Sequence, residues 1–229
     1  PLTQEEEFSY QFSAYKGESL KVQSELFPIT PLKCRVLNEF RLFEKAESEV
    51  VLLAKDEDGF SLQVNLGFND DQFYINIDSN INQEFLQEEC EVLTLKSMNQ
   101  QFTVDLKLDP FFICIRDANK TLLESHDFLS FIECTTDKNQ HIRDLKLNLH
   151  TPLNESFYGF GERYNAVEQR GNIIDCYVYN QYRDQGTRTY MPVPFYISSL
   201  GYGLVVNTNR YTHFDIAYSL KDAMSIKIR

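Results

Sequence analysis

"FTVDLKL", at residues 102–108, alternates apolar and polar side chains with a strict period of two. Successive side chains of an extended chain point to opposite faces, so this period gives one apolar and one polar face. The apolar face carries Phe102, Val104, Leu106 and Leu108. Pro110 interrupts the run, and "FFICI" (111–115) resumes it. We therefore predict two central strands of a sheet that buries one face.

The same alternation extends outward along the chain. The further strand-like runs are "VVLLA" (50–54), "FSLQVNL" (60–66), "QFYINID" (72–78) and "IRDLKLNL" (142–149). The turn-like "DEDG" (56–59) separates the first two and predicts a hairpin. "VPFYI" (193–197) is expected to pair with "LVVNT" (204–208) across the turn at Ser198–Gly203.

Only two stretches look helical. "LNEFRLFEKAESE" (37–49) has apolar residues near helical spacing, and "INQEFLQEECEVL" (81–93) is ambiguous. Many short strands with turn residues between them, and no alternation of strand and helix, favour a sandwich or barrel. We predict that residues 1–229 form one all-β domain, an antiparallel β-sandwich with a few short helices.

The net charge of −12 excludes two classes of partner. Nucleic acids and anionic membrane surfaces bind basic patches, so we predict neither as a partner. No apolar run approaches the roughly 20 residues that a membrane-spanning helix needs. Neutral ligands such as sugars remain open.

The cysteines and histidines give no metal pattern. Five cysteines are present, an odd number with no C-x-x-C pair, and the four histidines are scattered. We predict buried free thiols, which are typical of a reducing compartment and place the protein in the cytoplasm. We predict no metal and no cofactor.

The second part of the chain differs from the first. Nine of the thirteen tyrosines of the whole chain fall within residues 157–214, and tyrosine suits sites where one end of the ring stays wet. Gly159-Phe160-Gly161 is no dinucleotide fingerprint, because Tyr164 stands where the third glycine should be. The carboxylates of this region that glycoside chemistry could use are Glu155, Glu162, Glu168, Asp175 and Asp184.

Four segments resemble one known family in series. "FYGFGERYNAVEQRG" (157–171) resembles the Phe-Tyr-Gly-Leu-Gly-Glu-Arg-Phe segment of glycoside hydrolase family 31, the α-glucosidase and α-xylosidase family. "YMPVPFYISSLGYGLVVNT" (190–208) is similar to that family's Pro-Phe-Tyr run, polar turn, Gly-Tyr-Gly and valine-rich strand. "FDIA" (214–217) and "LDPFFICIRDANKTLLES" (108–125) resemble further family segments.

The resemblance implies the N-terminal domain of a larger enzyme. In that family these segments form a β-sandwich similar to galactose mutarotase, and the catalytic (β/α)₈ barrel that follows supplies both catalytic aspartates. Residues 1–229 would then end before the last strand of the sandwich and before the barrel, with no catalytic residue of their own. The implied partners are an α-glucoside or α-xyloside substrate and the chain's own C-terminal barrel. Glu162 and Arg163 would order strand ends rather than catalyse.

The resemblance also singles out "DCYVYNQYRDQGTRTY" (175–190). In the family a loop here reaches over the barrel mouth, where a Trp-Asn-x-Asp stretch supplies an aspartate that binds substrate. This chain has Tyr179-Asn180 instead; an ungapped match puts Tyr182 at the aspartate position, and a two-residue shift puts Asp184 there. We predict these four residues as substrate-binding. A solvated loop ordered by Arg183 and Asp184 is the alternative.

Two other functions stay open. One is a stand-alone carbohydrate-binding module, against which the absence of tryptophan counts mildly. The other is a β-sandwich that serves protein–protein interaction without binding sugar.

Overall fold

The computed structural model describes residues 32–79, 92–118, 120–180 and 183–229, together with the backbone of four short strands nearer the N-terminus. These four strands are β1 (Phe8–Tyr10), β2 (Ser13–Lys16), β3 (Ser19–Gln23) and β4 (Phe27–Ile29). β1 pairs with β4, and β2 pairs with β3. Throughout the described residues the regular elements are strands, and every pairing between them is antiparallel.

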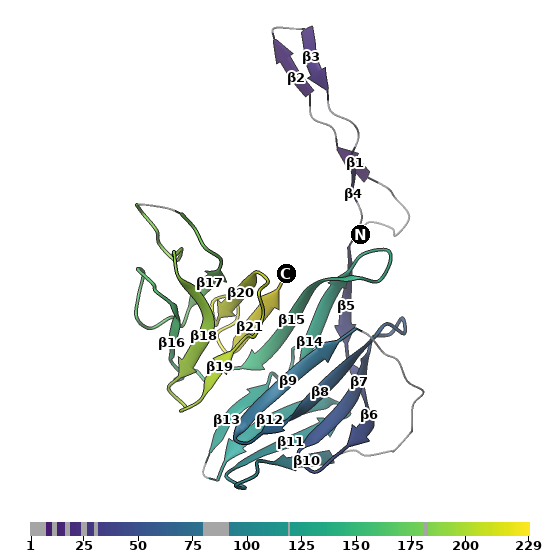
Figure 1. Ribbon diagram of the computed structural model, residues 1–229, viewed down its shortest axis with the longest axis vertical. Helices are drawn as coiled ribbons and strands as arrows, with labels where there is room; N and C mark the ends of the chain where they lie inside the picture. Colours follow the sequence, from purple (N-terminus) through teal and green to yellow (C-terminus); the bar gives the residue numbers. More distant parts are fainter. Residues whose placement is uncertain are drawn as a thin grey trace.

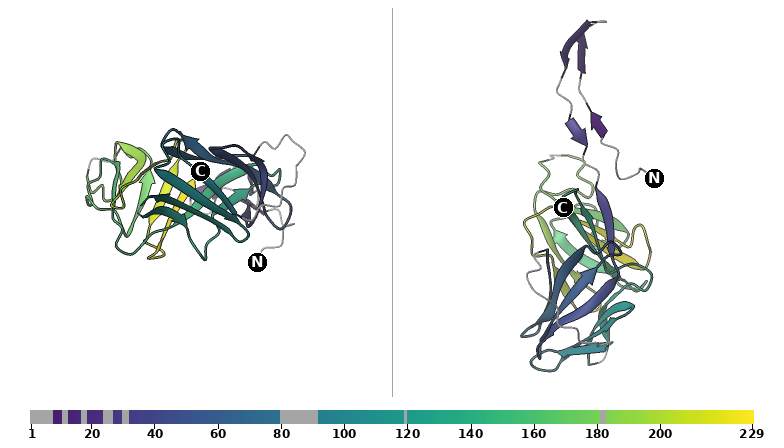
Figure 2. Two further views of the ribbon diagram at one scale, coloured as in Figure 1. Left: turned by 90° about the horizontal axis from the view of Figure 1, so that it is seen from below. Right: turned by 90° about the vertical axis from the view of Figure 1, so that its right-hand side faces the viewer.

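The first half of the domain is a two-layer sandwich (Figures 1 and 2). One layer is the four-stranded sheet β6 (Glu39–Lys45), β7 (Glu49–Lys55), β8 (Ser61–Asn69) and β9 (Gln72–Asp78). The facing strands are β10 (Val92–Lys96), β11 (Phe102–Leu108), β12 (Phe111–Asp117) and β13 (Thr121–Ser125). The apolar faces predicted from the alternation meet in the core between the layers, where Leu66, Val104 and Leu106 are fully buried.

The local predictions for these strands are confirmed. β7 and β8 form the hairpin across the 56–59 turn, and β11 and β12 are both internal strands. Phe73, Ile75 and Ile77 of β9 pack together against the core. The all-β antiparallel sandwich predicted from the sequence is the fold of this domain.

The helix expected at residues 37–49 is wrong, because this stretch contains β6. Phe40 and Leu42 are buried while Glu39 and Arg41 are exposed, which is the period of a strand. A β-bulge between Leu42 and Glu44 adds Phe43 out of phase, so the apolar spacing resembles that of a helix. In the other ambiguous stretch, residues 81–91 lie outside the described residues, and Val92 begins β10.

The sheet of β10–β13 continues into the second half of the domain. β13 pairs with β15 (Ile142–His150), which also pairs with β14 (Ile132–Thr136) and with β21 (Ala223–Ile228). The remaining members are β5 (Lys33–Leu37), β17 (Asn172–Cys176) and β20 (Thr212–Ile216). Figure 1 shows β14 and β15 running between the two halves.

A separate sheet covers β17, β20 and β21. It consists of β16 (Phe157–Gly161), β18 (Pro192–Ser198) and β19 (Gly203–Val205). Its inner face carries Phe160 and Tyr196, whose rings stack at 5.4 Å, and Phe214 of β20 meets Phe160 at 5.1 Å. The predicted pairing of residues 193–197 with 204–208 is confirmed through Tyr196 and Leu204.

The glycines of β16 allow a close backbone approach. Gly159 and Gly161 have φ of +122° and +86° around a bulge. A Cβ on Gly159 would lie 2.9 Å from the carbonyl oxygen of Phe195, and one on Gly161 would lie 2.7 Å from the nitrogen of Val193. Only glycine fits both the conformation and the space, so the glycine-rich segment docks β16 closely onto β18.

The four described cysteines are free. Cys114 and Cys134 are buried and Cys176 is half-buried, but Cys34 is exposed, which corrects the expectation that the thiols are buried. Cys34 points outward because the alternation of β5 turns Arg35 and Leu37 inward. Cys90 lies outside the described residues. Among the described residues, no helix is long and apolar enough to cross a membrane.

Candidate functional site

The 175–190 loop leaves β17 and returns to β18, and its two arms are tied together at the base. Val178 forms a bridge with Thr189, and the Tyr179 nitrogen donates to the Thr189 carbonyl at 3.0 Å. Thr189 is buried, and its hydroxyl accepts a hydrogen bond from the Met191 nitrogen at 3.1 Å. The two arms of the loop are therefore held together at their base.

Arg163 anchors the loop from the end of β16. Its guanidinium donates to the carbonyl oxygens of Phe160 at 2.9 Å and Thr187 at 2.7 Å, with a longer contact to Asp175 at 3.4 Å. Burial lowers the pKa of Arg163, yet an arginine stays charged because its ordinary value is so high. Arg163 therefore orders backbone, as expected for a charged side chain at a loop base.

A cluster of tyrosines is formed by two residues of the loop and one that precedes β20. The rings of Tyr177 and Tyr179 meet at 5.2 Å, and the Tyr211 ring lies 6.0 Å from Tyr177. The guanidinium of Arg188 sits over the Tyr179 ring, 5.1 Å from its centroid. Tyr177 is 54% exposed, so the cluster presents an aromatic ring to solvent, and Arg188 places a polar group on the neighbouring Tyr179. Aromatic faces with a few placed polar groups suit a sugar, which has both C–H faces and hydroxyls.

Asp175 supports this cluster from below. Its Oδ1 accepts hydrogen bonds from the Tyr211 hydroxyl and from His213 Nδ1, the latter at 2.7 Å. A carboxylate can only accept, so Nδ1 of His213 carries the proton. Burial would raise the pKa of Asp175, but these two hydrogen bonds outweigh it and hold the pKa below its ordinary value. Asp175 is thus an ionised support for Tyr211.

Comparison with known proteins identifies the family. The glycosyl hydrolase 31 N-terminal galactose mutarotase-like domain matches residues 51–215. The chain belongs to this family.

The relatives of this family 31 domain are longer proteins. The isomaltosyltransferase of Sporosarcina globispora is 36% identical over 126 residues, which is 53% of this chain and 12% of that protein. The 1,3-alpha-isomaltosidase of Kribbella flavida is 45% identical over 65 residues, 26% of this chain and 9% of that protein. The cycloalternan-forming enzyme from Listeria monocytogenes, solved with a pentasaccharide substrate, shares the fold with a TM-score of 0.80 at 24% identity. That match covers 97% of this chain and 22% of the enzyme.

The four residues predicted to bind substrate differ in their exposure to solvent. Tyr179 is half-buried under Arg188, within the tyrosine cluster. Asn180 and Asp184 are exposed, and Asp184 has φ of +52°. Tyr182 lies outside the described residues. Sequence reasoning missed that Tyr177 contacts Tyr179 and that Tyr211 contacts Tyr177.

The other carboxylates considered from the sequence are engaged with neighbours. Glu155 is buried and accepts hydrogen bonds from the Ser198 and Tyr202 hydroxyls, and burial raises its pKa. Glu168 accepts from the backbone nitrogens of Phe157 at 3.1 Å and Arg170 at 2.8 Å. Glu162 is exposed, and its backbone nitrogen donates to the Met191 carbonyl at 3.1 Å. Glu155 and Glu168 therefore fix local structure.

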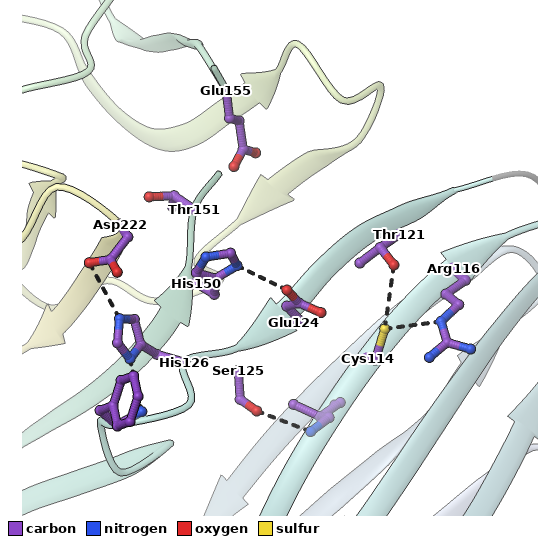
Figure 3. A network of polar contacts seen from close by, with 12 residues as sticks. Cys114, Arg116, Thr121, Glu124, Ser125, His126, His150, Thr151, Glu155 and Asp222 are labelled. Atoms are coloured by element: carbon purple, nitrogen blue, oxygen red, sulfur yellow. Dashed lines mark hydrogen bonds and ion pairs between the residues drawn. The ribbon is translucent and has the colours of Figure 1, made fainter. Parts of the chain in front are cut away.

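A second polar cluster joins the two halves of the domain (Figure 3). His150 Nδ1 lies 2.9 Å from Glu124, and His126 Nε2 lies 3.5 Å from Asp222, an ion-pair distance too long for a good hydrogen bond. The two histidine rings are 6.0 Å apart, although their sequence spacing suggests no pair. In the part of the chain that the structure describes, no group of three ligating side chains could hold a metal.

Proposed function

We propose that this chain is the non-catalytic N-terminal domain of a longer retaining α-glycosidase, and that its 175–190 loop forms part of the substrate site. The anchored loop, with the exposed Tyr177 ring of its tyrosine cluster, is the observation that carries the proposal. Arg163 and Thr189 hold this loop, and Asp175 holds Tyr211 beside it, which is more order than a solvated connection needs. The chain, residues 1–229, would be one domain that precedes a catalytic (β/α)₈ barrel.

The non-catalytic role is supported by the environments of the carboxylates. A glycosidase needs an acid and a second carboxylate about 5–10 Å apart around an open sugar site. Glu155 and Glu168 are engaged with protein donors, and Asp175 is held by Tyr211 and His213. Of the two exposed candidates, Asp184 is assigned to substrate binding, which leaves Glu162 without a partner carboxylate. The catalytic pair would therefore come from the barrel, and the 229-residue chain alone would be inactive on aryl α-glucosides and α-xylosides.

The substrate class is an α-glucoside, and the relatives favour one with isomaltosyl units. Two similar proteins are named for isomaltosyl transfer and for isomaltoside cleavage. An α-xyloside is the alternative, and it lacks only the C6 hydroxymethyl group of a glucoside. The free thiols of the described cysteines support the cytoplasm as the location.

The test compares two exposed tyrosines in the protein encoded by the full reading frame. Tyr177 lies on the loop, and Tyr218, at a similar exposure of 57%, lies on the β20–β21 turn. Tyr177→Ala should lower kcat/KM for isomaltosides about 5–160-fold if a stacking contact of roughly 1–3 kcal/mol is lost, and Tyr218→Ala should leave it unchanged. Equal kinetics in both variants would remove the loop from the substrate site.

A stand-alone carbohydrate-binding module is the second candidate, favoured by the same exposed Tyr177 ring. It would bind isomaltose without a catalytic partner. Calorimetric titration of the 229-residue chain with isomaltose, beside the Tyr177→Ala variant, separates the two functions. Binding by the chain alone that Tyr177→Ala abolishes would favour the module over the enzyme domain.

A further inference from the structure

The outer face of the β16–β18–β19 sheet is apolar and exposed. It consists of Tyr158 on β16, Val193, Phe195 and Ile197 on β18, and Val205 on β19. Tyr158 is paired with Ile197, and Phe195 with Val205, so the side chains are neighbours across three strands. Ile197 is 52% exposed and Val205 66% exposed. We refer to these five residues as the outer face.

Other sheets of the same chain expose polar faces. The outward positions of β11 are Thr103, Asp105 and Lys107, and those of β8 are polar as well. On β18 this pattern is reversed, because Ser198 faces inward while Val193, Phe195 and Ile197 face outward. An antiparallel sheet with one solvated face normally alternates apolar-in and polar-out. Contiguous exposed apolar surface of this kind marks an interface.

The outer face is also shaped for contact. Gly203 lies opposite Ile197 in the register, and the Phe195 ring lies over the position a side chain would take. A Cβ on Gly203 would lie 3.0 Å from that ring. The glycine therefore leaves room for the phenylalanine ring to lie against the sheet. None of the five side chains of the outer face carries a charge, although the chain as a whole has a net charge of −12.

We propose that the outer face packs against the catalytic domain of the longer polypeptide, an inference that rests on the proposed function. The relatives supply the first argument, since this chain spans only 12% of the isomaltosyltransferase and 22% of the Listeria enzyme. Most of each of those proteins therefore lies beyond the matched region, which is enough chain to cover a sheet.

Continuity with the loop supplies the second argument. β18 begins at Pro192, directly after the 175–190 loop, and Met191 between them is 63% exposed. A body that receives the loop would therefore also meet the strand that follows it. An apolar protein surface is the matching chemistry, because an uncharged face gains by burial and offers nothing to a charged partner.

Three phenylalanines allow a matched measurement in the protein encoded by the full reading frame. Phe128 is 91% exposed, Phe195 is 37% exposed and Phe214 is fully buried. Hydroxyl-radical labelling followed by mass spectrometry gives the oxidation rate of each ring. Because all three residues are phenylalanines with equal intrinsic reactivity, their rates differ only through their exposure to solvent. If the catalytic domain covers the outer face, Phe195 should react at the slow rate of Phe214, at least tenfold below Phe128. A rate for Phe195 between the two references would overturn the proposal.

Two substitutions that each introduce a carboxylate provide a second test of the proposal. Ile197→Asp places a carboxylate on the outer face, and Asn76→Asp places one on the exposed side of β9. Ile197→Asp should raise the oxidation rate of Phe195 severalfold and lower the Tm of the protein, whereas Asn76→Asp should change neither. Equal responses of the two variants would contradict the proposal.

Two results separate this inference from others. If the protection of Phe195 rises with protein concentration and sedimentation shows dimers, the outer face binds a second copy of the chain. That result would overturn the proposal. An exposed Phe195 in a protein whose kcat/KM still falls on Tyr177→Ala would overturn the docking surface and leave the proposed function standing. Unchanged kinetics on Tyr177→Ala, in a protein whose Phe195 is protected, would overturn the proposed role of the loop and leave the docking surface standing.

Discussion

The guanidinium of Arg163, at the end of β16, donates a hydrogen bond of 2.7 Å to the carbonyl oxygen of Thr187, 24 residues later in the chain. The same side chain holds the Phe160 carbonyl at 2.9 Å. One arginine therefore fixes both the glycine-rich bend and the far arm of the 175–190 loop. The planar guanidinium can serve several carbonyls at once, which a lysine cannot do.

Arg163→Met should release the loop without unfolding the sandwich. Hydrogen bonds from a charged donor are worth about 1.5–3 kcal/mol each, so local opening should become about tenfold or more frequent. The rate of limited trypsin cleavage after Arg183 and Arg188, both within the loop, measures this opening. Arg210→Met, an exposed arginine before β20, is the control and should digest at the wild-type rate. Resistance of the Arg163→Met loop to trypsin would mean that Thr189 and Val178 hold it alone.

Gly161→Ala should destabilise the domain more than Gly171→Ala. Both glycines have positive φ, +86° and +79°, so alanine is strained at each by about 1–2 kcal/mol. At Gly161 the added methyl also meets the backbone of Val193 at 2.7 Å, whereas at Gly171 nothing lies within 4 Å. The clash should add roughly 1–3 kcal/mol. Urea unfolding of both variants gives the difference, and equal losses would show that β16 can move away from β18.

The stability that Asp175 contributes should be lost in acid. Its folded-state pKa lies below the ordinary 3.8, so the contribution is present above that value and disappears as pH falls through the folded pKa. The difference in unfolding free energy between wild type and Asp175→Asn should therefore be largest near pH 6 and shrink below pH 3.8. Unfolding of both proteins in urea at several pH values measures it. A difference that stays constant with pH would mean that the Tyr211 and His213 bonds do not depend on the charge.

Glu155 should show the opposite trend. Burial raises its pKa above the ordinary 4.5, so its contribution is fully present below that value and falls as pH rises through the folded pKa. The advantage of wild type over Glu155→Gln should accordingly be greatest in acid and decline toward neutral pH. The same urea series measures it, and an advantage that grows with pH would contradict the burial of this carboxyl.

The sequence predicts the local strands well and the long-range neighbours poorly. The hairpin of β7 and β8 follows from alternation and a short turn, both of which are written in adjacent residues. The bulge at Phe43 could not be predicted, because it depends on the register of β6 against β7. Tyr211 reaches Tyr177 only because Thr212 pairs with Cys176 in the β17–β20 register. No local pattern in the sequence predicts that pairing, so the contact of Tyr211 with the tyrosines of the loop could not be predicted from the sequence.

Asp184→Ala should weaken substrate use in the protein encoded by the full reading frame. Asp184 is exposed at the far part of the loop, where a hydroxyl-binding group would touch the sugar but not the bond being broken. Such a group adds binding and positioning, not acid–base chemistry. Losing one hydrogen bond to a neutral sugar costs about 0.5–1.5 kcal/mol, or roughly 2–13-fold in kcat/KM. Tyr182→Phe tests the other residue that the family pattern places there.

Asp127→Ala is the matched control, since Asp127 is an exposed aspartate in the turn between β13 and β14. Its kcat/KM should equal that of wild type, and melting curves should show that none of the three variants unfolds the domain. Loss of a barrel nucleophile would cost many orders of magnitude, so a rim contact and a catalytic group are easily told apart. A fall confined to Asp184→Ala would assign the family's aspartate role to Asp184, and one confined to Tyr182→Phe would assign it to Tyr182. Wild-type kinetics in both would leave the loop as a solvated connection.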